Sequence, residues 1–386
     1  MNTHTIEDLS QMQSLALETK IIMTKQRIKA WYEAWTRFEI FDEKTHKTRF
    51  VTIDTRNGEL PELKETEWIK EAIDGQVYVS FSGGKDSTVL KHIVDSMYED
   101  VPSLFINTGL EYPEIQKFAM SQKNVVKARP EMCFVDVIKK YGYPVISKEV
   151  SKYIKEGRKA LQKGDMNYYA IQKLQGRLKD KSGNKSIYNC EKWAFMLGAP
   201  YKVSNYCCDV MKKRPAKRYE KETNRKPIIG TLASESKTRK QQWLVNGCNA
   251  FAKNNPSSQP LSFWTEQDIL HYIKKYDVPY CSVYGDIVLD LDNENQDQLS
   301  ILDLLSDYSP MDKLKTTGCN RTGCIFCMFG CHLEKEPNRF QKLKQTHPRQ
   351  YEYCIEGGEY IDGMLQPNKE GLGLGKVLDY IGVKYD

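Results

Sequence analysis

The stretch Val77-Tyr78-Val79-Ser80-Phe81-Ser82-Gly83-Gly84-Lys85-Asp86-Ser87-Thr88-Val89-Leu90 decides the fold. An apolar, β-rich run leads into a Ser/Gly turn, and apolar residues at helical spacing follow the turn. The pattern predicts a strand, a tight loop and a helix. Two glycines let backbone N–H groups turn toward one point, and the helix N-terminus adds the positive end of its dipole. The loop is therefore predicted to hold a phosphate group, with help from nearby hydroxyls and the Lys85 ammonium.

The composition favours a cytoplasmic protein with metal or redox chemistry. The chain has 386 residues, a net charge of +6 and 11 cysteines. Its first residues contain no basic-then-apolar run, and no apolar stretch approaches the length of a bilayer, so we expect neither a signal peptide nor a membrane partner. In a reducing compartment an odd number of cysteines favours metal binding over disulfides. The mild positive charge suits an anionic substrate without requiring nucleic acid.

Strand and helix patterns alternate downstream of the loop. A second short apolar run, over residues 103–109, ends in a turn, and Val125–Ala128 is a third predicted strand; helices are expected to follow each of them. This order predicts an α/β fold with a doubly wound, mostly parallel sheet, in which ligands bind at the carboxyl ends of the strands. Residues 1–75 are predicted to form a helical preamble that carries no chemistry, with a short hairpin near residues 41–55.

Residues 147–190 interrupt the alternation and are predicted to be an insertion of two helices, over residues 148–163 and 167–179. Many of their residues are basic. Two interpretations stay open: ordinary solvated helix faces, or a basic wall that faces an anionic substrate such as nucleic acid. Residues 293–307 are acidic and are expected at the surface.

The cysteines form two clusters, the adjacent pair Cys207-Cys208 and the run from Cys319 to Cys331. Thiolates so close together repel one another unless a cation or an inorganic cluster neutralises them. The C-x4-C-x2-C spacing of Cys319, Cys324 and Cys327 suits an iron–sulfur cluster, a closed zinc site is the rival, and a group of unrelated free thiols is the third reading.

These motifs resemble those of a known superfamily and of one family within it. The string Ser-Gly-Gly-Lys-Asp-Ser at residues 82–87 is similar to the PP-loop of the adenine-nucleotide α-hydrolase superfamily, in which the loop holds a pyrophosphate. Asn-Thr-Gly-Leu-Glu-Tyr-Pro-Glu at residues 107–114 resembles a segment of the phosphoadenylylsulfate (PAPS) reductase family that lines the nucleotide site, with Asn107 in place of the usual Asp. The resemblance covers roughly residues 76–330. It implies the following nucleotide-binding residues: Ser80, Ser82, Gly83, Gly84, Lys85, Asp86, Ser87, Thr108, Gly109, Glu111 and Gly230.

The same resemblance implies a ligand set and a catalytic set. Cys-Cys-x3-Lys-x2-Pro at residues 207–215, followed by Gly-Cys-x2-Cys at residues 323–327, is similar to the [4Fe–4S] motif of iron–sulfur sulfonucleotide reductases. Carried over, the ligands are Cys207, Cys208, Cys324 and Cys327, with Cys319 as the strongest competitor and a local set with Cys331 as a further option. Lys85, Asp86 and Arg239 are the implied catalytic residues, with Asp86 as the candidate ligand of Mg²⁺.

Three functions follow from the resemblance. ATP-dependent sulfur transfer is favoured, because the PP-loop is intact and the reductases' C-terminal Glu-Cys-Gly-x-His motif is missing; Cys354 is the one late cysteine. Reduction of PAPS or adenylylsulfate to sulfite is the alternative, and a non-catalytic nucleotide-binding regulatory protein is the third. The expected partners are ATP or a sulfonucleotide, and a sulfur donor or a thiol reductant protein. The predicted regions are 1–75, 76–275 for the nucleotide-binding domain, and 276–386 for the cysteine-rich region and tail.

Overall fold

A computed structural model describes residues 4–251, 254–290 and 312–386. The acidic segment 293–307, predicted at the surface, lies outside the described residues. The chain forms two compact units. The first consists of Met1–Asn107, Tyr112–Ala128 and Ala216–Thr322, and the second of Thr108–Glu111, Arg129–Pro215 and Gly323–Asp386. The chain leaves and re-enters each unit, so the units do not coincide with the three consecutive regions predicted from the sequence.

The first unit is built on a six-stranded sheet of order β6-β5-β4-β8-β10-β9. Its strands β4, β5, β6, β8 and β10 run parallel, and β9 pairs antiparallel with β10 at one edge. The mostly parallel α/β sheet predicted from the sequence is therefore confirmed. The strands are β4 (Val77–Phe81), β5 (Ser103–Ile106), β6 (Val125–Ala128), β8 (Lys226–Ile229), β9 (Asn249–Ala250) and β10 (Ser257–Ser258).

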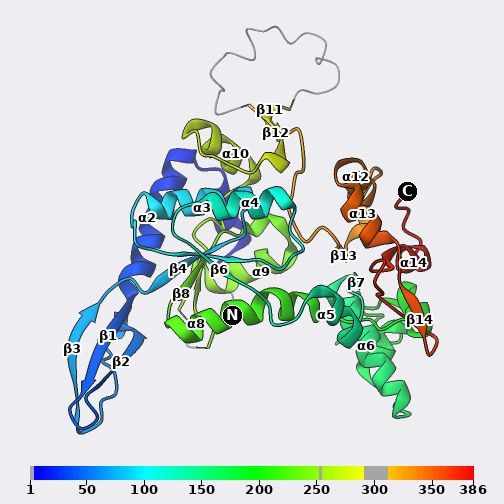
Figure 1. The fold of residues 1–386 in the computed structure, drawn as a ribbon, viewed down its shortest axis with the longest axis horizontal. Helices are drawn as coiled ribbons and strands as arrows, with labels where there is room; N and C mark the ends of the chain where they lie inside the picture. The colour runs from blue at the N-terminus through cyan, green and yellow to red at the C-terminus, as the bar shows by residue number, and fades with distance from the viewer. Residues whose placement is uncertain (1–3, 252–253, 291–311) are drawn as a thin grey trace. The chain divides into compact units, whose positions relative to one another are not determined.

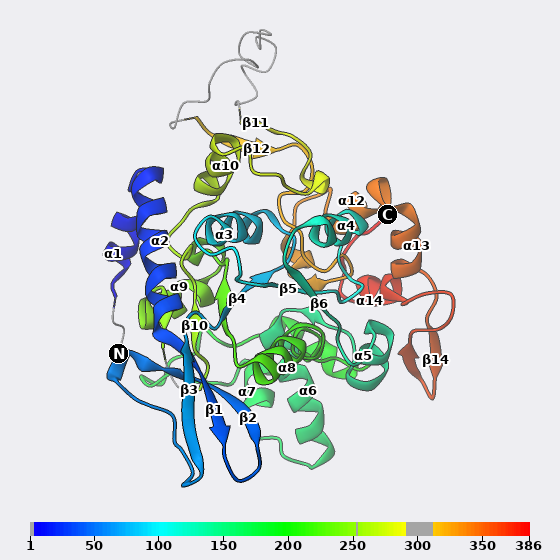
Figure 2. The same cartoon turned by 60° about the vertical axis from the view of Figure 1, so that its left-hand side comes forward.

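Helices cover both faces of this sheet (Figure 2). Alternation along β4 places Val79 and Phe81 in one core with Leu90 of α3, because successive side chains of a strand point to opposite faces. Tyr78 points to the other face, where its ring lies 5.1 Å from that of Tyr219 on α8. The helices are α3 (Lys85–Asp95), α4 (Pro113–Ser121), α8 (Arg214–Thr223), α9 (Lys237–Asn246) and α10 (Glu266–Lys275).

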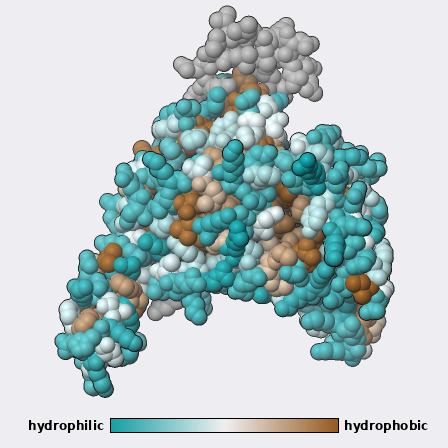
Figure 3. Space-filling model, viewed as in Figure 1, coloured by the Kyte–Doolittle hydropathy of each residue, from teal (hydrophilic) through white to brown (hydrophobic). Residues whose placement is uncertain are grey.

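The N-terminal part of the first unit is only partly helical. Helices α1 (Ile6–Gln13) and α2 (Leu17–Ala34) precede an antiparallel sheet of order β2-β1-β3, formed by β1 (Trp35–Asp42), β2 (Lys47–Asp54) and β3 (Glu67–Ile73). The predicted hairpin is present, and β3 is an additional strand. This sheet projects from the rest of the unit, and its visible surface is mostly hydrophilic with a few hydrophobic residues (Figures 1 and 3). Strands β11 (Ile287–Leu289) and β12 (Leu314–Thr316) form a separate antiparallel pair.

The second unit is mainly helical. Strand β7 (Val145–Ile146) pairs in parallel with β13 (Met328–Phe329), and β14 (Glu359–Ile361) pairs with β15 (Met364–Gln366). The first predicted helix of the insertion is present, whereas the second ends at Leu174. Among the described residues, no helix is both long and apolar enough to cross a bilayer. The helices are α5 (Phe134–Tyr141), α6 (Lys148–Gln162), α7 (Tyr169–Leu174), α12 (Arg339–Thr346), α13 (Pro348–Ile355) and α14 (Leu374–Tyr380).

Candidate functional site

The loop between β4 and α3 makes a sharp turn that its glycines permit. Gly83 has φ +72°, a conformation that favours glycine, and a Cβ there would lie 3.0 Å from Ile115 Cγ2. Gly84 is the N-cap of α3, and a Cβ at this position would lie 3.1 Å from Thr322 Oγ1. A side chain at either glycine would therefore crowd the surrounding residues. A helix N-terminus, which can bind an anion, follows the loop directly.

Hydroxyl groups inside the loop hold its shape. Ser87 Oγ donates to the Gly84 carbonyl at 2.9 Å and accepts from the backbone N–H of Ser82 at 3.2 Å. Ser82 Oγ lies 3.0 Å from Ser87 Oγ, and Thr88 Oγ1 donates to the Gly84 carbonyl at 3.0 Å. The serines predicted as nucleotide-binding residues thus lie together, and in this structure they tie the first turn of α3 to the end of β4.

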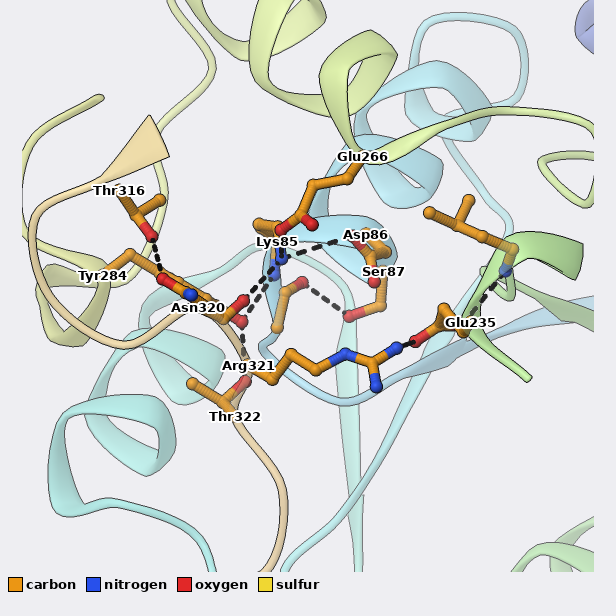
Figure 4. A network of polar contacts seen from close by, with 12 residues as sticks. Lys85, Asp86, Ser87, Glu235, Glu266, Tyr284, Thr316, Asn320, Arg321 and Thr322 are labelled. Atoms are coloured by element: carbon orange, nitrogen blue, oxygen red, sulfur yellow. Dashed lines mark hydrogen bonds and ion pairs between the residues drawn. The ribbon is translucent and has the colours of Figure 1, made fainter. Parts of the chain in front are cut away.

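Lys85 is held by segments far away in the sequence. Its buried ammonium donates to the Asn320 carbonyl at 2.8 Å and pairs with Glu266 Oε1 at 3.1 Å (Figure 4). Its backbone N–H donates to Tyr284 Oη at 3.1 Å, and that hydroxyl lies 2.6 Å from Thr322 Oγ1. Burial raises the pKa of Tyr284 to about 12, so this hydroxyl stays neutral and available as a hydrogen-bonding group.

Asp86 carries a carboxylate oxygen that lacks a hydrogen-bond donor. Its Oδ1 is buried without a hydrogen-bond partner, and Lys85 Nζ lies 4.0 Å away, beyond hydrogen-bonding distance. Burial raises the pKa of Asp86, while the positive charge of Lys85 opposes this shift. Gly230, which follows β8, packs against the same turn: a Cβ there would lie 3.1 Å from the Asp86 carbonyl oxygen. The orphaned oxygen is a candidate ligand for a cation.

Arg239 belongs to the same group of charges. It pairs with Glu235, which also accepts a hydrogen bond from Arg321 at 2.6 Å (Figure 4). Burial lowers the pKa of Arg239, and the nearby Arg321 acts in the same direction, whereas Asp86 opposes them. The three residues predicted to be catalytic, Lys85, Asp86 and Arg239, are thus brought within electrostatic reach of one another.

A cavity of about 460 Å³ opens beside these charges. Its wall mixes acidic, basic and hydroxyl groups, so it can bind a ligand that carries both phosphate oxygens and a metal ion. The cavity is lined by Lys85, Asp86, Leu232, Ser234, Glu235, Thr265, Glu266, Gln267 and Arg321.

Ser80 and Asn107, which belong to or follow the neighbouring strands β4 and β5, have different surroundings. Ser80 lies inside β4, between Leu104 of β5 and Ile229 of β8 in the sheet register, and is only partly buried. Asn107, which stands where the family usually has Asp, follows β5 and donates a side-chain hydrogen bond to Gln116 at 3.1 Å. A neutral amide at this position therefore fastens the end of β5 to α4.

The turn Thr108–Glu111 belongs to the second unit. The buried Glu111 carboxylate accepts from the Thr108 backbone N–H at 3.0 Å and from Thr108 Oγ1 at 2.7 Å. Gly109 has φ +75°, which the turn requires. Glu111 also interacts electrostatically with Lys212 and Cys324. These residues, predicted to line the nucleotide site, therefore lie among the groups around the thiols of the second unit.

The second unit brings the four predicted ligand thiols together. Burial raises the pKa of Cys207, and the negative charges of Cys324, Cys208 and Cys327 raise it further, so all four interact. Burial likewise raises the pKa of Cys324 to about 11, while Lys212 opposes this shift. Thiols whose charges act on one another suit a thiolate cluster that an inorganic core neutralises. Their role as ligands remains a prediction.

Lys212 is the main positive charge beside these thiols. Burial disfavours its charge, but Cys324 and Glu111 outweigh that effect and raise the pKa of Lys212. It lies in a short π-helix, Asp209–Lys213, that follows Cys208 and continues into α8. The Lys212 side chain also forms a hydrogen bond with Cys324, so it contacts one of the predicted ligand thiols directly.

The remaining cysteines divide between the two units. Cys319 lies in the first unit, interacts with Cys281, and donates its backbone N–H to Val283. Cys331 is buried in the second unit near Cys327. In the described parts of the chain, no group of three or more His, Cys, Asp or Glu side chains is arranged to hold a metal ion.

Sequence reasoning missed the residues that enclose Lys85. Glu266 belongs to the acidic first turn that follows the N-cap Thr265, and Asn320 and Arg321 lie between Cys319 and Cys324. Tyr284 and Glu235 lie in 3-10 turns, Ser282–Tyr284 and Ala233–Glu235, which carry no recognisable motif. A charge at a helix N-terminus could have indicated Glu266, but the other contacts carry no local signal.

The sheet, the loop and the helix N-terminus define an α/β protein in which a glycine-containing loop leads into a helix at the carboxyl end of strand β4. The sequence matches the phosphoadenosine phosphosulfate reductase domain over residues 76–199 and 148–328, two overlapping segments that together span about two thirds of the chain. The chain therefore belongs to this family, which is part of the PP-loop superfamily.

Two curated relatives come from Methanocaldococcus jannaschii. The uncharacterized protein MJ0973 is 25% identical over 281 residues, which cover 72% of this chain and 47% of that protein. The uncharacterized protein MJ0066 is 22% identical over 286 residues, which cover 73% of this chain and 41% of that protein. The chain thus spans less than half the length of these relatives. The crystal structure of phosphoadenylyl-sulfate reductase from Candida auris, in a phosphate complex, has a TM-score of 0.29 and 16% identity, covering 54% of this chain and 75% of that chain.

Proposed function

We propose that the protein is an ATP-dependent sulfur-transfer enzyme. The PP-loop would bind ATP, an acceptor oxygen would attack the α-phosphorus, and pyrophosphate would leave. A sulfur donor would then displace AMP from the adenylated acceptor. The family as a whole is associated with sulfonucleotides, and this proposal differs from sulfonucleotide reduction in the bond that breaks first.

One observation carries the proposal: the loop presents Lys85 and the orphaned Asp86 oxygen together beside a cavity. A pyrophosphate leaving group needs positive charge, which Lys85 and the helix N-terminus supply. Mg·ATP also needs an oxygen ligand, and Asp86 Oδ1 is buried without a hydrogen-bond partner. Arg239 would contribute a second positive charge to the phosphates. The ion pair between Lys85 and Glu266 would have to open when phosphate binds.

The cysteine cluster supports an iron–sulfur cofactor. Cys207, Cys208, Cys324 and Cys327 are the residues that would hold a [4Fe–4S] cluster, since their thiols interact with one another; Cys207 is buried and the other three are partly buried. When bound, such a cluster supplies electron transfer or a sulfur-binding iron. Lys212 would balance part of the thiolate charge, and Glu111 would hold Lys212 in position.

The alternative, reduction of PAPS or adenylylsulfate, needs a thiol that can reach the sulfate. Cys354 is the late cysteine, and it lies on α13 with no exposed surface. Burial also raises the pKa of the Cys354 thiol, which disfavours the nucleophilic thiolate. Both properties argue against Cys354 as the attacking group and so favour sulfur transfer.

The test uses anaerobically purified protein. Separate incubations with Mg·ATP, adenylylsulfate and PAPS are assayed for pyrophosphate, AMP and sulfite. Pyrophosphate and AMP from ATP are the expected products. Sulfite from a sulfonucleotide, without pyrophosphate from ATP, would establish the reductase alternative. Nucleotide binding without any product across a panel of acceptors would favour the regulatory protein.

A further inference from the structure

Helix α6 of the second unit separates its charges. Lys148, Lys152, Lys155 and Lys159 recur at spacings of four, three and four residues, so they form one stripe along the helix. The helix's acidic residues lie beside this stripe and are already bonded: Tyr153 donates to Glu149 and Tyr169 donates to Glu156. Within the described part of the chain, no carboxylate lies within ion-pair distance of the four lysines.

Aromatic rings continue the stripe. Lys155 Nζ lies 4.0 Å from the centre of the Tyr206 ring, and Tyr206 meets Tyr141 edge-on at 5.2 Å. Lys140 Nζ lies 5.4 Å from the centre of the Tyr141 ring. Tyr206 is 37% exposed. We call this set the basic–aromatic surface: Lys140, Tyr141, Lys148, Lys152, Lys155, Lys159 and Tyr206.

The basic–aromatic surface ends at the cysteine cluster. Tyr206 directly precedes Cys207, and Cys208 is partly exposed. The next charged pair along the chain, Arg214 with Asp209 at 3.0 Å, adds no net charge. Unneutralised lysines and the exposed ring of Tyr206 thus lie beside the thiols that the proposed function assigns to sulfur chemistry.

We infer that the basic–aromatic surface binds a single-stranded nucleic acid, which is the acceptor in the proposed function and so rests on that function. A row of lysines neutralises the phosphates of a nucleic-acid backbone, and the exposed ring of Tyr206 can stack on an unpaired base. A duplex keeps its bases stacked on one another, so no base face is free to stack on a tyrosine ring. An acidic peptide would use the lysines but not the ring faces.

Fluorescence anisotropy tests the inference with labelled oligouridylate, oligothymidylate and a duplex, each about 20 nucleotides long, over a salt series. We expect both single strands to bind more tightly than the duplex; a difference between the two reports RNA or DNA preference. The triple variant K152Q/K155Q/K159Q should reduce the slope of log affinity against log salt by about 2, at about 0.7 per lost phosphate contact. Tyr206→Ala should weaken binding about tenfold at every salt concentration with the slope unchanged, and Tyr206→Phe should retain binding.

A matched control removes the same charge elsewhere on the second unit. Lys335, Lys342 and Lys369 are exposed, and their triple glutamine variant should bind like the parent protein. Equal loss in both triple variants, or competition by polyglutamate with no effect of Tyr206→Ala, would show a general polyanion surface and overturn the inference.

Pyrophosphate release from ATP, measured on the same preparations, separates the two ideas. Release without strand binding at low salt would refute the nucleic-acid surface and leave the proposed adenylation standing. Strand binding without release under any condition would refute adenylation and support the surface alone.

Discussion

Replacing Lys85 by methionine tests the loop most directly. Methionine keeps the buried stem of the side chain and removes the ammonium, which contacts the Asn320 carbonyl at 2.8 Å and Glu266 at 3.1 Å. One charge-assisted hydrogen bond to phosphate contributes about 1.5–3 kcal/mol, so losing it should slow pyrophosphate release about 10- to 150-fold. Glu266 remains largely exposed after the change, whereas the buried Asp86 carboxylate loses its nearest positive charge at 4.0 Å, so the variant should also lower Tm.

Lys91→Met is the matched control. Lys91 lies on the same helix α3, is as buried as Lys85, and pairs with Asp95 at 2.7 Å. This variant loses an ammonium from the same helix without touching the loop, so it should lower Tm and leave pyrophosphate release unchanged. The assay is steady-state pyrophosphate release with Mg·ATP, together with thermal unfolding. Equal rates for Lys85→Met and the parent protein, or equal losses in both variants, would refute the assignment of Lys85 to the leaving group.

Three further predictions follow from the site. Burial raises the pKa of Asp86, so ionisation of its carboxyl destabilises the fold at pH values above the folded-state pKa and has no effect below about pH 4. Asp86→Asn should therefore raise Tm at neutral pH, and this gain should vanish as the pH falls. A gain in Tm that is the same at every pH would exclude this origin. Gly230→Ala places a Cβ 3.1 Å from the Asp86 carbonyl oxygen, so the turn must shift, and ATP binding measured by calorimetry should weaken. Gly198→Ala, with no atom within 4 Å, should leave ATP binding unchanged; equal affinities of the two variants would show that the turn can move. Anaerobically purified Cys324→Ser should contain little of the iron and acid-labile sulfide of the parent protein, whereas Cys319→Ser should retain both. The reverse result would replace Cys324 by Cys319 in the ligand set.

Local sequence patterns were sufficient to predict the strand and the helix on either side of the loop. The strand Val77–Phe81 and the following helix agree with the apolar run and the helical spacing that predicted them. Strand β3 was missed because its side chains are mostly exposed or half-buried, so it lacks the apolar alternation by which strands are recognised. The second helix of the insertion ends at Leu174, short of the predicted Lys179, where Gly176 has φ +68° and the helix cannot continue.

Contacts between distant segments were beyond sequence reasoning. Nothing near Lys85 in the sequence indicates that Glu266, Asn320 and Tyr284 surround it. Periodicity reports how a segment buries its own face, whereas these contacts depend on how the chain returns to the same edge of the sheet. The same limit applied to Cys319, whose spacing to Cys324 resembled that of a ligand although the two residues belong to different units.

By itself, the sequence determined the α/β class, the strand, loop and helix at residues 77–95 and the family, because each depends on short strings whose backbone conformation is set by glycine, by periodicity and by the helix N-terminus. Only the tertiary structure decided which charges meet that loop, and which cysteines gather around Lys212. The physical reason is that electrostatic interactions and burial act through space: a carboxylate shifts the pKa of its neighbour across a few ångströms, regardless of how many residues separate them along the chain.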